Sequence, residues 1–237
     1  NSLITVPVMF QFGIPEKEAV ATNMFGLVFM SIGATIPFVR RGAINFRAST
    51  PLIALTVVSS ALGAALVGYI TDQSIKLIVS VAMIVVVLFT LMRNSGGQNI
   101  VDAGDLECES RSASQTTRFY LAIAYVCTFL LGIYGGLYSG GYVTILTAVF
   151  VAFLGMGFGE AVAATKFVNV FSSSVATMVF MWQGLVNYRL GAILAVTMFV
   201  GAYAGAHYAS RMNDVWLKRI FLATVSILAI KTLYDFV

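Results

Sequence analysis

The sequence has 237 residues, of which 59% are apolar and only 10% are charged, and its mean hydropathy is +0.91. Soluble domains carry about 25% charged residues, so this composition excludes a large soluble enzyme or a transcription factor and indicates a membrane protein. The net charge of +4 is of the kind that collects in cytoplasmic loops, and it is not interpreted as a nucleic-acid surface. Cys108, Cys127 and a lone His207 support neither a disulfide framework nor a metal centre, so no cofactor and no metal is expected.

Nine apolar segments follow one another along the chain. Most of them reach the roughly 20 residues that a helix needs to cross hydrocarbon, whereas the first and sixth are shorter and flanked by glycine, which is typical of half-helices. We therefore predict an all-α, polytopic protein of the cell (inner) membrane with about nine transmembrane or half-membrane helices and the lipid bilayer as its environment. The segments cover residues 3–12, 19–39, 51–70, 75–92, 119–138, 142–155, 161–182, 190–209 and 215–237.

One polar interval, residues 93–117, interrupts this pattern. Its Gly, Ser, Asp and Asn content cannot bury enough apolar surface to fold on its own, so we predict a linker. The linker would separate a first repeat, residues 1–92, from a second repeat, residues 118–237.

These two parts resemble each other in sequence. A displacement of 142 residues aligns residues 18–47 with residues 160–189 without a gap, and fourteen of the thirty positions are identical. Shared apolar composition alone would give about two or three identities, so the sequence predicts a duplicated bundle. The second copy also has a helix and the glycine-rich GIYGGLYSGGY (residues 132–142) ahead of its short segment. Their mates would precede residue 1, so we expect the first copy to lack its opening helix.

The distribution of basic residues predicts the orientation. If every segment crosses and the residue 40–47 loop is cytoplasmic, nine basic residues lie inside. Lys17, Lys76, Arg189 and the near-terminal Lys231 then lie outside. An odd number of segments per copy makes the two repeats inverted, as in many transporters, whereas re-entrant short segments would make them parallel. The inside set is Arg40, Arg41, Arg47, Arg93, Arg111, Arg118, Arg211, Lys218 and Arg219.

Polar side chains at membrane depth are candidates for a binding site. Lys166 lies about six residues into its apolar segment, where an unpaired ammonium is costly. It either snorkels to the nearby interface or faces a bound anion. Hydroxyl and amide donors accompany it on both copies of the same helix, which suits a small oxyanion better than a metal ion. The predicted substrate-binding residues are Thr22, Asn23, Ser31, Thr165, Lys166, Asn169 and Ser173.

Other residues have two interpretations each. Glu18 and Glu160 stand in the first turns of matched helices, where they complement the helix dipole, and proton coupling through either of them or through His207 is the functional alternative. The glycines at 135, 136, 140 and 141 allow tight helix packing, or a backbone break that aims free N–H groups at an anion. Gly63, Gly201 and Gly205 are interpreted as packing contacts.

Ordered motifs resemble a known family. AVATN at residues 19–23, AATK at 163–166 and GLVNYR at 184–189 are similar to those of the TauE/SafE sulfite exporter family of membrane permeases. Asn23 departs from the serine more usual there. The resemblance implies two inverted repeats that transport a small sulfur-containing anion such as sulfite, thiosulfate or an organosulfonate. The residues themselves indicate only a small anion.

Two other functions compete with secondary transport by alternating access. A duplicated polar core also suits a passive anion channel. Ser139 beside a glycine, with His207 on a later helix, is what an intramembrane serine protease would need. A protease would not require duplication of the whole bundle, so we expect a transporter and no enzyme. Oligomeric state, coupling ion and direction of transport are not specified by the sequence.

Overall fold

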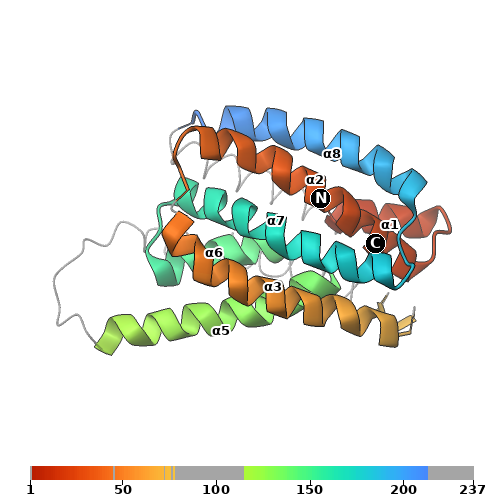
Figure 1. The fold of residues 1–237 in the computed structure, drawn as a ribbon, viewed down its shortest axis with the longest axis horizontal. Helices are drawn as coiled ribbons and strands as arrows, with labels where there is room; N and C mark the ends of the chain where they lie inside the picture. Colours follow the sequence, from red (N-terminus) through yellow and green to blue (C-terminus); the bar gives the residue numbers. More distant parts are fainter. Residues whose placement is uncertain (1, 45, 72, 76, 78–114, 213–237) are drawn as a thin grey trace, which may run out of the picture.

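The computed structural model describes residues 2–44, 46–71, 73–75, 77 and 115–212. These ranges contain seven helices and no strand, and Figure 1 shows the long helices packed side by side in one bundle. Five of the helices are long and apolar enough to cross a membrane: α2, α3, α5, α7 and α8. The helices are α1 (Ser2–Gln11), α2 (Glu16–Arg40), α3 (Phe46–Tyr69), α5 (Gln115–Leu137), α6 (Tyr142–Leu154), α7 (Phe158–Trp182) and α8 (Tyr188–Ala209).

The predicted all-helical, membrane-spanning character is therefore confirmed for the described ranges. The fourth predicted segment lies almost entirely outside them, and the ninth lies wholly outside. α5 starts at Gln115, inside the predicted linker. The two segments predicted to be short form helices of 10 and 13 residues. At 1.5 Å per residue they extend about 15 and 20 Å, less than the roughly 30 Å of bilayer hydrocarbon.

The helix bounds follow the sequence repeat. Both ends of α7 lie 142 residues after the ends of α2, and α8 begins 142 residues after α3. The turns match too: Gly42 and Gly184 are counterparts and have φ of 67° and 70°. An L side chain rarely adopts this backbone conformation, so glycine is required at both turns.

Contacts between the halves are also duplicated. The rings of Phe25 and Tyr188 meet edge to face with centroids 6.4 Å apart, and those of Phe46 and Phe167 do so at 5.3 Å. Phe167 is the counterpart of Phe25, and Tyr188 is the counterpart of Phe46. Each contact is thus the other one with the two copies exchanged.

The directions of the central helices follow from hydrogen bonds at their ends. Near the start of α2, Glu18 accepts a bond from Asn187, which caps α8; at the end of α2, Arg41 donates to Ser210, which follows α8. α2 and α8 therefore run parallel. Because a short turn joins α7 to α8, α2 and α7 run in opposite directions, as Figure 1 shows. Arg41 thus lies at the opposite end of the bundle from Lys17, in agreement with the predicted separation of inside and outside charges.

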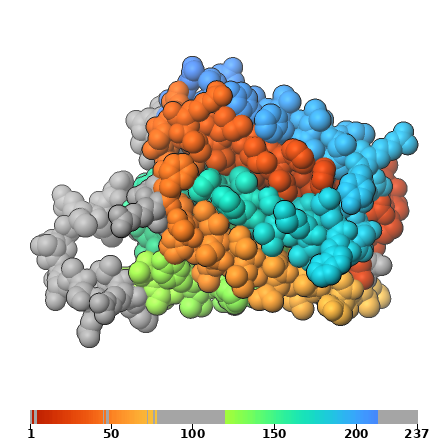
Figure 2. All heavy atoms as spheres, viewed as in Figure 1, coloured from red at the N-terminus to blue at the C-terminus, as the bar shows by residue number. Residues whose placement is uncertain are grey.

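Burial distinguishes the central helices from the peripheral ones. α2 is the most buried of the candidate spans and α8 the least. Figure 2 shows α8 along the upper edge of this face and α5 along the lower edge. The outer helices expose large apolar side chains such as Val58, Leu130 and Val196, which is the surface that lipid requires.

Candidate functional site

A buried polar cluster lies where α2 packs against α7. The Asn169 amide nitrogen donates to the Ser31 hydroxyl across 2.6 Å, and the Ser172 hydroxyl donates to Asn169 Oδ1 across 3.4 Å. Ser173 donates to the backbone carbonyl of Asn169. Ser31 and Ser173 are counterparts in the two copies. These four residues, called the crossing cluster below, therefore lie where the two halves meet.

Lys166 lies on the same side of α7 as this cluster. It precedes Asn169 by three residues and Ser173 by seven, so at about 100° per residue their directions differ by about 60° and 20°. The side chain is half-buried and forms no hydrogen bond or ion pair with another residue in the described ranges. This arrangement leaves an ammonium group one helical turn from buried hydroxyl and amide groups.

A second polar cluster lies at the N-terminal ends of the two short helices. Ser2, the first residue of α1, accepts a bond of 2.9 Å from the Asn23 amide, and its hydroxyl lies 2.6 Å from that of Ser139, which precedes α6. Tyr138 donates to the Ser2 carbonyl. Asn23 Oδ1 is buried and has no hydrogen-bond partner. We call Ser2, Asn23, Tyr138 and Ser139 the half-helix cluster.

The glycine-rich segment serves both of its predicted roles. Gly136 packs against the Ser60 backbone, and Gly135 packs against the Tyr142 ring, so these two are packing contacts. Gly141 has φ of 76° and separates α5 from α6, so it forms the backbone break. The first N–H groups of α6 have no helical carbonyl to pair with, and the helix dipole makes this end attractive to an anion.

Thr165 and Thr22 lie apart from the crossing cluster. The Thr165 hydroxyl lies 3.1 Å from that of Thr147 and so joins α7 to α6. Thr22 accepts a bond of 3.0 Å from the backbone N–H of Asn187. The predicted site residues are thus distributed along the interface between the halves rather than gathered at one point.

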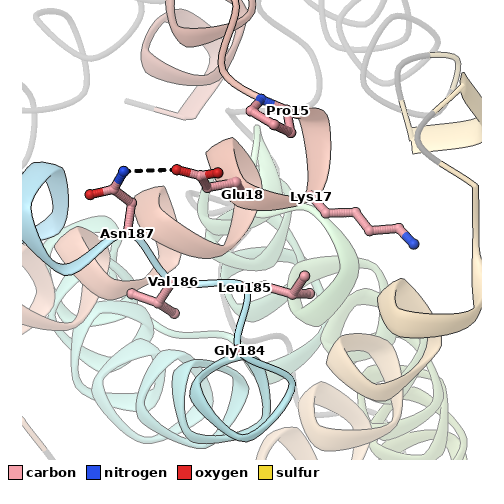
Figure 3. A pocket seen from close by; sticks show the side chains of 7 residues that line it. All are labelled: Pro15, Lys17, Glu18, Gly184, Leu185, Val186 and Asn187. Atoms are coloured by element: carbon pink, nitrogen blue, oxygen red, sulfur yellow. Dashed lines mark hydrogen bonds between the residues drawn. The ribbon is translucent and has the colours of Figure 1, made fainter.

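A surface depression of about 440 Å³ lies above Thr22, between the start of α2 and the turn from α7 to α8. Asn187 organises it: Nδ2 donates to Glu18 Oε1 across 2.8 Å, and Oδ1 caps α8 by accepting from Leu190 N–H. Figure 3 shows Glu18 pointing toward Asn187, whereas Lys17 points away. The lining residues are Pro15, Lys17, Glu18, Gly184, Leu185, Val186 and Asn187.

The other predicted titratable residues have separate surroundings. Glu160 is exposed in the first turn of α7, and Asn45, the counterpart of Asn187, lies outside the described ranges. The His207 ring stacks on Tyr203 with centroids 6.3 Å apart. Ser139 is bonded to Ser2, and the described part of the chain holds no Ser139–His207 hydrogen bond, so the geometry that a serine protease would need is not found there.

Sequence reasoning missed several partners of the site. Ser2 was hidden at the very start of the first short segment, and Ser60, which donates to the Ser172 carbonyl across 2.8 Å, sits in an ordinary apolar segment. In the described ranges no three His, Cys, Asp or Glu side chains are grouped as metal ligands would be.

Comparison with known proteins places these features in a family. The family model described as "Sulfite exporter TauE/SafE" matches residues 1–232. The chain is similar to a protein of Sinorhizobium sp named "Probable membrane transporter protein ORF9", with 29% identity over 99% of this chain and 85% of that relative. It is also similar to "Probable membrane transporter protein YfcA" of Escherichia coli K12, with 26% identity over 99% of this chain and 82% of the relative. No solved structure matches the chain. The chain therefore belongs to the sulfite exporter TauE/SafE family of membrane proteins.

Proposed function

We propose that this protein is a secondary transporter that moves a small sulfur-containing anion across the cell membrane by alternating access. The family supports membrane transport, and its name supports sulfite, thiosulfate or an organosulfonate as substrate. The observation that carries the proposal is the crossing cluster, because it joins counterpart serines of the two copies one turn from Lys166.

The chemistry of this region suits an anion with several oxygens. α7 contains two charged side chains, Glu160 in its first turn and Lys166 in its interior. Lys166 would supply the charge, while Ser31, Asn169 and Ser173 would supply hydroxyl and amide donors. Charge-assisted hydrogen bonds are roughly twice as strong as neutral ones, and a water-poor site strengthens them further.

The half-helix cluster would contribute backbone donors. α1 starts at Ser2 and α6 starts at Tyr142, and the Ser2–Ser139 bond brings these two starts together. Half-helices whose N-terminal ends meet at the centre of a transporter aim positive dipole ends at a bound anion. Asn23 would join this set through its amide.

Alternating access follows from the relation between the halves, which we propose to be inverted repeats. α2 and α7 run in opposite directions, and the duplicated ring contacts exchange when the copies are exchanged. Two such halves can each adopt the conformation of the other, which opens a shared site to alternate sides of the membrane.

Proton coupling, where it occurs, would use Glu18, Glu160 or His207. Glu18 is the best placed of the three, since its carboxylate accepts a bond from Asn187 and so ties α2 of the first copy to α8 of the second. Protonation would weaken this charge-assisted bond and loosen the joint between the halves.

The test is uptake of radiolabelled sulfite and organosulfonate into proteoliposomes. Lys166→Met places on α7 the residue that the first copy carries at Met24, and it should abolish uptake while the protein still elutes as a folded species. Lys17→Met, on the exposed first turn of α2, should retain wild-type uptake. Unchanged uptake by Lys166→Met would remove Lys166 from the site.

Counterflow separates a carrier from a passive channel. Vesicles preloaded with unlabelled anion should accumulate labelled anion transiently above the outside concentration, because a carrier exchanges substrate across its two conformations. A channel would only equilibrate the label, and that result would reject alternating access.

A further inference from the structure

Small residues allow α5 to pack closely against α3. A Cβ added to Gly63 of α3 would overlap the Ile133 carbonyl of α5, and one added to Gly136 of α5 would overlap the Ser60 backbone. Ser59, one turn before Gly63, is fully buried in this contact. Close backbone approach through small residues is the usual basis of helix association in membranes.

The matching surface of α8 carries no such partner. The counterparts of Ser59 and Gly63 are Gly201 and Gly205. Both are exposed, and a Cβ added to either would have nothing within 4 Å. The prediction that Gly201 and Gly205 make packing contacts is therefore wrong for the described structure, whereas Gly63 fulfils it.

The difference is confined to one side of the two helices. Val58 of α3 is 57% exposed and its counterpart Val200 of α8 is 60% exposed, so both helices present the same side to lipid. Only the adjacent stripe differs, being covered by α5 on α3 and open on α8.

The short helices show the same difference independently. Phe150 of α6 is fully buried in a cluster that includes Tyr125 and Leu131 of α5. Its counterpart on α1 is Val8, which is 40% exposed. α5 thus covers one surface on α3 and another on α6, and the counterparts of both surfaces are open on α8 and α1.

We infer that these open surfaces seat one helix, the counterpart of α5, which precedes Asn1 in the full-length protein. The relatives contain sequence for it, since the match covers 85% and 82% of their lengths. The helix lies along Gly201 and Gly205 and also covers Val8. The inference concerns the assembly of the bundle and is independent of the transport proposal.

Disulfide cross-linking in the full-length protein tests this placement, in a background with Cys108→Ser and Cys127→Ser. Gly205→Cys is combined with single cysteines placed in turn along the segment before Asn1. One or two positions per helical turn should give an intramolecular disulfide, as should the control pair Gly63→Cys with Ile133→Cys. A disulfide that forms only between two molecules would identify a second copy as the occupant and overturn the inference, as would no disulfide at any position.

A spin label gives a second measurement that does not depend on reaction geometry. On Gly205→Cys of the full-length protein the label should be immobilised, whereas on Ala204→Cys, whose counterpart Leu62 is 49% exposed, it should be mobile. Equal mobility at the two positions would overturn the inference.

Discussion

The bond between Asn169 and Ser31 is the strongest polar link between α2 and α7 at the crossing cluster, and Ser31→Ala removes its acceptor. Ser31 is fully buried and Asn169 is 3% exposed, so the amide N–H of Asn169 would be left without water. An unpaired buried donor costs about 1–3 kcal/mol, while interhelical hydrogen bonds in membrane proteins contribute about 0.6 and at most about 1.7 kcal/mol. We expect Ser31→Ala to lower the free energy of unfolding by about 1 kcal/mol.

A double-mutant cycle isolates this bond. Asn169→Leu should cost about 2 kcal/mol, since it also leaves the Ser172 hydroxyl without Oδ1. The double variant should cost about 1 kcal/mol less than the two single changes together, because the shared bond is lost only once.

The assay is reversible unfolding in mixed micelles, with Ser174→Ala as the matched control. Ser174 donates to the Val170 carbonyl of its own helix, so its loss should combine additively with Ser31→Ala. Full additivity of Ser31→Ala with Asn169→Leu would refute the coupling of α2 to α7 through this bond.

Three further predictions use the same unfolding measurement. Asn187→Ala removes the α8 cap and the partner of Glu18 and should cost about 1–2 kcal/mol; a change below about 0.3 kcal/mol would show that the joint carries no stability. Phe46→Leu and Tyr188→Leu break counterpart ring contacts and should each cost about 1 kcal/mol, whereas very unequal costs would contradict the equivalence of the halves. Gly136→Ala should lower the melting temperature by several degrees because its Cβ meets the Ser60 backbone, and an unchanged melting temperature would show that the helices can separate freely.

The repeat and the helices could be predicted because they depend on local pattern. α7 ends at Trp182 as predicted, and Gly184 and Asn187 form the turn glycine and the helix cap that their residue types indicated. Gly141 likewise breaks the chain where the glycine cluster suggested a break.

The directions of the polar side chains could not be predicted, because they depend on which helices pack together. Asn23 and Ser31 lie on one helix, yet Asn23 turns to Ser2 of α1 and Ser31 accepts from Asn169 of α7. Thr22 was grouped with them by proximity in sequence, but its hydroxyl accepts the Asn187 N–H at the surface depression. Gly201 and Gly205 show the same limit, since small residues indicate a contact without saying which helix supplies it.

Cysteine labelling from each side of the membrane tests most directly whether the crossing cluster is an alternately exposed anion site. Ser31→Cys and Ser173→Cys, each in a background with Cys108→Ser and Cys127→Ser, are treated with a membrane-impermeant thiol reagent added outside or inside oriented vesicles. Both positions should react slowly from both sides, and sulfite or an organosulfonate should slow the reaction. Reaction from one side only, or a rate that no sulfur-containing anion changes, would contradict the proposed transport mechanism.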